Sequence, residues 1–478
     1  MTRTLALLAL LALASPAMGN ATETALDSLV TPDERAFLLE TIAAIDPPTR
    51  ICELAEFGSR QSALGGGFYG MLPDQLTPAD SLPVPADEDS RLAAVLVLAR
   101  QRETNRAALA ALNPDYPVTF GATSLADFLL DLPASELGPP PDGDALRLAL
   151  DLSAVRGFLA ARADGAIDRS EAAALAALPS NVAMLEHRRN LGYVPEPLPD
   201  AEALAAFIGQ AGSPDPLDRL WCWVSSQNAF GYADLAEQPT GYGDLVAQLN
   251  AHGDALAAAV LGRIARFAPE DARLETTFAF TVGWAIRGWA TPAMAGLNVE
   301  QVKDDWDFLY GTLVEETYHR LQLELFPSAD GAPARTFDDL VAADTGDPRL
   351  DRLQEILAYT AAEGAANLVR GRFAPAGLDA KAPEGAALLA RFVGEVVEGG
   401  NLEAADALIN EGLRGNGPLY GLGLRLATAI ADTDGDHAVG EWQQRGAAAF
   451  VLRGAELSAA GGTPLLAADV IAAVERLR

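Results

Sequence analysis

The sequence predicts a mostly α-helical protein with a small β-sheet, an α+β fold. Half of the 478 residues are hydrophobic, a share that supports buried cores and argues against disorder. Apolar residues recur at helical spacing along most of the chain. The clearest strand signal is the β-branched and aromatic stretch Thr276 to Val282, and a second short strand is expected over Ala293 to Val299.

The N-terminus has the pattern of a secretory signal peptide. The apolar run Leu5 to Ala14 follows a basic residue and precedes small residues, so cleavage near Gly19 would remove residues 1–19. That run is too short to span a bilayer, and no later apolar stretch is long enough. The chain is therefore expected to be exported, periplasmic or secreted, and soluble, with no membrane span. Export permits a disulfide, so Cys52 and Cys222 either pair or remain buried free thiols.

The charge of the chain limits its partners. With 66 acidic and 34 basic residues, the formal net charge is −32 at pH 7. Such a chain repels phosphate groups, which excludes nucleic-acid binding through phosphate contacts and argues against anionic membrane surfaces.

Helical segments follow one another along the chain. The first opens with a capping box, Thr31-Pro32-Asp33-Glu34, and stops at Asp46-Pro47-Pro48. The Pro-rich stretch Tyr193 to Asp200 is the best linker, so residues 20–199 are expected to form an N-terminal helical region and residues 200–478 a second domain. Further helices are expected over residues 90–112, 144–162, 170–178, 181–191, 200–210, 244–267, 349–370, 383–398, 402–413, 418–431, 437–451 and 463–477.

The longest helical pattern, Asn298 to Pro327, carries the candidate functional residues. Glu315 and His319 are spaced i, i+4 and Glu316 and His319 are spaced i, i+3, so all three side chains share one face of the helix. Two carboxylates and an imidazole on one face are typical of a metal site. The alternative is a polar face whose acids are held in an ion pair by Arg320 or another arginine.

The order of two strands, a long helix and a second helix resembles the gluzincin-type zinc peptidases. In that class an HExxH helix supplies two histidine ligands and a glutamate base, and a later helix supplies a glutamate ligand. Here the motif reads Glu315-Glu316-Thr317-Tyr318-His319, with Glu315 in place of the first histidine. The stretch Glu363-Gly364-Ala365-Ala366 is similar to the EGxA element that carries the third ligand.

Three other stretches resemble one domain-of-unknown-function family described as zinc-dependent peptidases. They are Gly296-Leu297-Asn298, Gly417-Pro418-Leu419-Tyr420 and the segment Ser180 to Leu191. The resemblance implies a gluzincin-like domain over residues 200–478 and an exported metallopeptidase-like hydrolase that acts on a peptide or protein.

The resemblance also implies roles for individual residues. Glu315, His319 and Glu363 would bind one divalent metal, Glu316 would act as the general base, and Tyr420 would donate to the oxyanion. With Glu315 in place of a histidine ligand, the negative charges of the ligands cancel the charge of a dication. The resemblance implies zinc, and the oxygen-rich ligand set also suits manganese or iron. The alternatives are a catalytically inactive peptidase-like protein that binds a peptide or partner in the cell envelope, and a helical envelope protein whose acids are surface charge.

Two other metal sites are not expected. A di-iron carboxylate bundle needs a second Glu-x-x-His, which the chain lacks. The calcium-like stretches Asp164 to Glu171 and Asp432 to Asp436 each lack part of an EF-hand ligand set, so both are interpreted as capped turns and calcium is not expected.

Overall fold

The computed structural model describes residues 24–46, 50–51, 91–100, 102–103, 118–138, 145–163, 165–190, 201–211, 213–225, 232–283, 288–326 and 345–477. The expected signal peptide, the expected linker and the pairing of Cys52 with Cys222 lie outside what it describes.

A four-stranded mixed sheet forms the centre of the fold, in the order β1-β2-β4-β3. Strands β1 (Leu146–Asp151), β2 (Leu274–Thr281) and β4 (Ala295–Asn298) are parallel, and β3 (Gly288–Ala290) runs antiparallel to β4. The prediction of a mostly helical chain with a small sheet is confirmed, and both predicted strands are found. The sheet contains strands from both sides of the expected boundary near residue 199.

The first strand corrects the sequence prediction, which placed a helix over residues 144–162. There the chain forms β1 and then a helix that begins at Ser153. The Leu- and Ala-rich strand segment has good helix propensity, but it pairs along its whole length with β2, from Leu146 opposite Leu274 to Asp151 opposite Ala279. This long-range pairing overrides the local preference.

Helices make up most of the rest of the described chain. The α-helices are α3 (Pro32–Ala44), α6 (Leu125–Asp131), α7 (Ser153–Ala163), α8 (Arg169–Ala176), α9 (Pro179–Asn190), α10 (Ala201–Gln210), α11 (Pro216–Ser225), α12 (Tyr232–Glu237), α13 (Pro239–Ala265), α14 (Val299–Val302), α15 (Trp306–Leu325), α17 (Pro348–Arg370), α18 (Ala382–Phe392), α19 (Ala404–Leu413), α20 (Pro418–Asp434), α21 (Ala438–Gln444), α22 (Ala447–Ala460) and α23 (Ala468–Glu475). Two 3-10 turns, η3 (Gly371–Phe373) and η4 (Asp379–Lys381), and a π-helical turn, η5 (Val393–Glu398), are also present. Residues 91–100 are helical as well. The predicted capping box at Thr31 is present at the start of α3.

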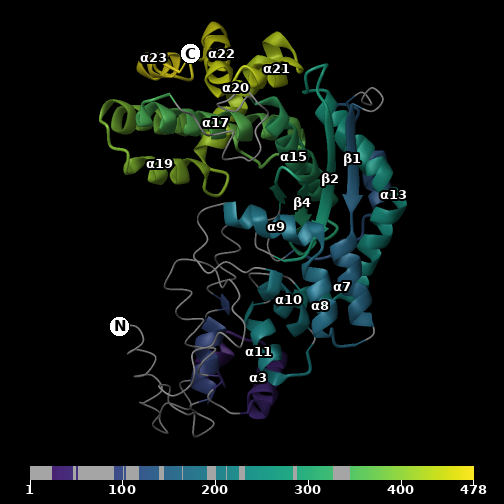
Figure 1. Cartoon of the computed structure of the whole chain (residues 1–478). Helices are drawn as coiled ribbons and strands as arrows, with labels where there is room; N and C mark the ends of the chain where they lie inside the picture. Colours follow the sequence, from purple (N-terminus) through teal and green to yellow (C-terminus); the bar gives the residue numbers. More distant parts are fainter. Residues whose placement is uncertain are drawn as a thin grey trace.

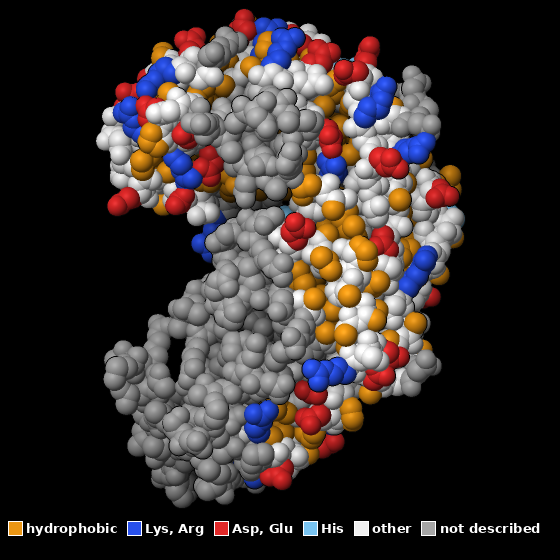
Figure 2. All heavy atoms as spheres, viewed as in Figure 1, with side chains coloured by type: hydrophobic (Ala, Val, Ile, Leu, Met, Phe, Trp, Pro, Cys, Tyr) orange, Lys and Arg blue, Asp and Glu red, His pale blue; other side chains and the backbone are white. Residues whose placement is uncertain are grey.

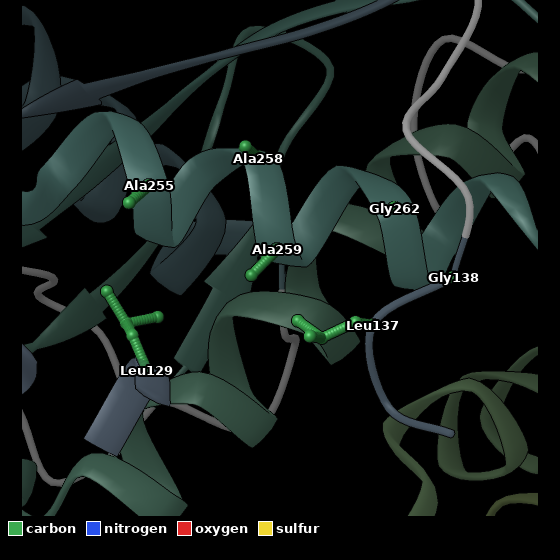
Figure 3. A pocket seen from close by; sticks show the side chains of 7 residues that line it. All are labelled: Leu129, Leu137, Gly138, Ala255, Ala258, Ala259 and Gly262. Carbon is green, nitrogen blue, oxygen red and sulfur yellow. The ribbon is translucent and has the colours of Figure 1, made fainter. Parts of the chain in front are cut away.

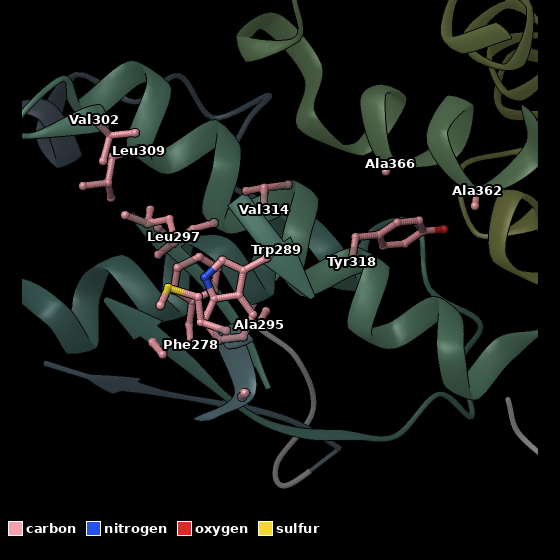
Figure 4. Close-up of a cluster of buried hydrophobic side chains, with 14 of the residues drawn as sticks. Phe278, Trp289, Ala295, Leu297, Val302, Leu309, Val314, Tyr318, Ala362 and Ala366 are labelled. Carbon is pink, nitrogen blue, oxygen red and sulfur yellow. The ribbon is translucent and has the colours of Figure 1, made fainter. Parts of the chain in front are cut away.

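Helix α15 lies between the sheet and the C-terminal helices (Figure 1). It packs against β2, β3 and β4, and also against α17 and α21, while α13 covers β1. Figure 4 shows Phe278, Trp289 and Leu297 of the sheet gathered next to Val314 of α15, and these side chains are almost fully buried. The strands therefore hold α15 in a fixed place, from which its polar residues meet α17.

The predicted helix Asn298 to Pro327 is wrong at its start, because the chain breaks between α14 and α15. Lys303 has a positive φ of 45°, a conformation that costs energy for a residue with a side chain. Asp305 then caps α15, its side chain accepting a hydrogen bond from the Phe308 N–H. The functional helix begins at Trp306.

Tertiary contacts of Lys303 account for the break. Its Nζ lies 3.2 Å from Oδ2 of Asp234, and the side chain is almost fully buried. The ammonium group also lies over the rings of Phe120 and Tyr242. A continuous helix would remove the buried ammonium from these partners, and an unpaired buried charge is costly.

A second predicted helix is also divided. Residues 437–451 form parts of α21 and α22, which are separated at Gly446 with a φ of 94°. Such a conformation suits glycine and ends a helix.

The surface seen in Figure 2 carries acidic and basic side chains mixed together over the C-terminal helices. Ion pairs such as Arg453 with Asp434 (2.7 Å) and Arg352 with Glu355 (2.5 Å) belong to these helices. Much of their negative charge is therefore compensated locally.

Candidate metal centre

The structure brings together the three predicted metal ligands. Glu315 and His319 lie one turn apart on α15, and Glu363 lies on α17, which packs against α15. One ligand atom from each residue lies within 4.8 Å of the other two. His319 Nε2 is 3.5 Å from Glu363 Oε2. The side chains thus converge on one small volume between the two helices.

The close crossing of α17 and α20 fixes the position of Glu363. The residue after it, Gly364, lies directly against Gly423 of α20, so that a Cβ at Gly364 would fall 2.0 Å from the Gly423 carbonyl carbon. Only glycine allows two backbones to approach so closely. Gly364 belongs to a stretch that resembles the zinc peptidases, and its contact with Gly423 holds α17 against α20.

The ring of His319 is oriented by a buried glutamine. Gln322 Nε2 donates to the Ala362 carbonyl at 2.9 Å, which leaves its Oε1 to accept from His319 Nδ1 at 2.7 Å. The hydrogen on Nδ1 directs Nε2 to Glu363. Metal-binding histidines typically have this arrangement, in which the distal ring nitrogen donates to a fixed oxygen.

The charges of the cluster determine the protonation of His319. Burial acts to lower the pKa of the imidazole, but the charge of Glu363 and its hydrogen bond, together with Glu316 and Glu315, raise that pKa to about 10. His319 in this arrangement is a cation paired with Glu363. A metal ion would have to displace the proton on Nε2.

Glu316 lies beside the cluster and against the sheet. A Cβ at Gly288 of β3 would fall 2.3 Å from Glu316 Oε1, so the carboxyl group occupies the space that a side chain there would fill. Burial raises the pKa of Glu316 to about 8; His319 opposes this rise, whereas Glu315 and Glu363 add to it. A carboxyl group that titrates near neutral pH suits proton transfer.

Glu315 also forms a buried ion pair. Its Oε2 lies 2.5 Å from Nη1 of Arg370, two turns after Glu363 on α17. The sequence had suggested Arg320 or another arginine for this role; Arg320 instead pairs with Glu324 at 2.8 Å. The ion pair and the three-residue cluster occur together in the structure.

His187 is a functional candidate that sequence reasoning missed. Its Nδ1 lies 3.0 Å from the Ala290 carbonyl of β3, and because a carbonyl only accepts, Nδ1 carries the hydrogen. Burial, with a further contribution from the charge of His319, lowers the pKa of His187 to about 4. A neutral imidazole from α9 thus contacts β3, the strand against which Glu316 also packs. No local spacing links His187 to the motif.

Gln322 and Arg370 were also missed. Gln322 follows His319 at i+3, so helical spacing could have identified it. Arg370 shares a helix with Glu363, but its pairing with Glu315 depends on how α15 and α17 pack.

Tyr420 is half-buried near the start of α20, one turn before Gly423. Its helix crosses α17 at Gly364, next to Glu363. Its role as an oxyanion donor stays a prediction.

An apolar hollow of about 270 Å³ lies elsewhere, on the surface of α13 (Figure 3). Its lining consists of Leu129, Leu137, Gly138, Ala255, Ala258, Ala259 and Gly262. None of these lining residues carries a titratable side chain.

Comparisons with protein-family models, with curated proteins and with solved structures find no match to this chain. Among the described helices, none has both the length and the apolarity needed to cross a bilayer.

Proposed function

We propose that this chain is a metallopeptidase-like hydrolase that binds one divalent metal through Glu315, His319 and Glu363. The observation that carries the proposal is the convergence of these three ligands around a histidine whose ring is already oriented by Gln322. A surface cluster of acids needs no such buried support.

The donor set suits a divalent ion. Two carboxylates and a neutral imidazole balance the charge of a dication, and the mixture of oxygen and nitrogen ligands is compatible with zinc, manganese or iron. When bound, such an ion lowers the pKa of a water molecule and polarises a carbonyl group.

Glu316 is the proposed general base. It lies beside the ligands, and burial raises its pKa to about 8. Its deprotonated form is therefore a stronger base than an ordinary carboxylate, and its protonated form is present near neutral pH to act as an acid. The same carboxyl group can deliver that proton to a leaving amine, so one residue serves both steps of hydrolysis.

The proposed substrate is an extended peptide. In the described part of the sheet, β3 is the outer strand. Thr291 N–H donates to Met294 O, and by the alternation of an antiparallel pair the backbone groups of Gly288 point away from β4. The Ala290 carbonyl also points away from β4, but it already accepts from His187 Nδ1. Gly288 lies directly beside Glu316, so a peptide added to this edge would pass the base.

One observation favours a second candidate, an inactive peptidase-like protein that binds a peptide. Arg370 already engages Glu315, and a carboxylate held in this way would be a weaker ligand. In this candidate the edge strand β3 would still bind peptides, without hydrolysis.

The test is hydrolysis of an unstructured protein such as casein by the zinc- or manganese-loaded chain. Glu316→Gln should bind metal normally and lose about 10²- to 10⁴-fold in rate, as expected for a general base. Glu324→Gln is the matched control, because Glu324 is a more exposed acid of the same helix. If wild type and Glu316→Gln are equally active, Glu316 is not the base; if the loaded wild type binds peptides without cleaving them, the second candidate is correct.

A further inference from the structure

Arg370 is a buried cation built into the metal centre. Arg370 is 5% exposed to solvent, and its Nη1 lies 2.5 Å from Glu315 Oε2. The guanidinium lies over the ring of Phe308 at 5.2 Å. Gly311 makes room for it, since a Cβ there would fall 3.0 Å from Arg370 Nε.

The charge of this arginine changes the balance of the site. Two carboxylates and a neutral imidazole cancel the charge of a dication, whereas two imidazoles and one carboxylate leave +1. Arginine is always protonated in proteins. When the charge of Arg370 is added to those of a dication, Glu315, neutral His319 and Glu363, the total formal charge is +1. This equals the charge of a site with two imidazoles and one carboxylate, which keeps a metal-bound water acidic.

We propose that Arg370 compensates for Glu315, so that the pair of residues takes the place of one histidine ligand. Arg370 engages Oε2 of the Glu315 carboxylate. This inference rests on the proposed metal centre and assigns Arg370 as a positioning residue that sets its charge.

If the ion pair of Arg370 with Glu315 has only a structural role, the expected effect of removing it is different. The ion pair would stabilise the packing of α15 on α17, and its loss would lower stability without a specific effect on metal affinity. The two roles are separated by changing the ligand and the arginine together.

The experiment measures zinc affinity by competition with a chromophoric chelator, alongside thermal unfolding in EDTA. Glu315→His alone creates a His, His, Glu ligand set but leaves the Arg370 charge beside the ion without its partner. We expect its zinc affinity to fall at least about tenfold below wild type, because the uncompensated charge repels the dication. Adding Arg370→Met should restore at least about tenfold of that loss.

Arg372→Met is the matched control. Arg372 is a half-exposed arginine two residues further on, and its nearest acid, Asp307, is exposed. This change should leave the zinc affinity within about twofold of the wild-type value. If Glu315→His fails to fold, Glu315→Gln and Glu315→Gln/Arg370→Met carry the same comparison with the same expected order.

The outcomes separate the two proposals. If wild type binds zinc and Arg370→Met brings no gain in the Glu315→His or Glu315→Gln background, the compensating role of Arg370 is overturned while the metal centre stands. If wild type binds no zinc, the metal centre itself is overturned, and this inference with it.

Discussion

The crossing of α17 and α20 at Gly364 leads to the sharpest mutational prediction. In Gly364→Ala the new methyl carbon falls 2.0 Å from the Gly423 carbonyl carbon, 2.3 Å from its Cα and 2.5 Å from its oxygen. All three contacts are with backbone, so no side chain can rotate away. Reaching the 3.4 Å of ordinary van der Waals contact requires the helices to separate by about 1.4 Å. Overpacking of this kind typically costs about 1–3 kcal/mol.

The separation should also disturb the metal centre. Glu363 is the neighbouring residue, and metal–ligand distances tolerate changes of only about 0.2 Å. We therefore expect a lower Tm together with a loss of at least about tenfold in zinc affinity, similar to the loss of a residue that supports a ligand.

Thermal unfolding and zinc titration of the same preparations provide the assay. Gly394→Ala is the control, because a Cβ there meets nothing within 4 Å and its backbone needs no positive φ. A Gly364→Ala protein with the Tm and the zinc affinity of wild type would refute the argument that this glycine positions Glu363.

Three further predictions follow from the electrostatics and the hydrogen bonds. First, because the pKa of His319 is about 10 and that of Glu316 about 8, zinc binding at pH 7 should release one to two protons. Calorimetry in two buffers of different ionisation enthalpy measures this release, and an affinity that does not change between pH 6 and 8 would contradict it. Second, Gln322→Leu removes the acceptor of the His319 Nδ1–H and should lower zinc affinity about 10- to 100-fold, measured by chelator competition with Tm as the control for folding. Unchanged affinity would show that the amide is not needed. Third, burial raises the pKa of Glu300 from 4.5 to about 8. An acid whose pKa is raised on folding contributes stability that is full below pH 4.5 and is lost as the pH rises through 8. The loss is on the order of 5 kcal/mol, and Glu300→Gln should remove it. Unfolding at pH 5 and pH 9 tests this, and equal pH dependence in the variant and wild type would be the contrary result.

The sequence was sufficient for the part of the site that depends on local spacing. Glu315, Glu316 and His319 share a helical face because the helix fixes the relation between i, i+3 and i+4. Glu363 was placed by the resemblance of Glu363-Gly364-Ala365-Ala366 to the EGxA element, and the structure brings it to His319.

The missed features depend on contacts between distant segments. Lys303 breaks the predicted helix because it pairs with Asp234. Arg370 meets Glu315 only when α15 and α17 pack together, and His187 reaches β3 from α9. No periodicity within a single segment reports such partners, which is also why β1 looked helical before its pairing with β2 was known.

The metal content of the purified chain tests the central claim most directly. After reconstitution with zinc or manganese and removal of free ions, elemental analysis should find about one divalent ion per wild-type chain and none in Glu363→Ala. Both proteins should show the same circular dichroism spectrum. A wild-type chain that stays metal-free, or a Glu363→Ala chain that holds as much metal as wild type, would contradict the account.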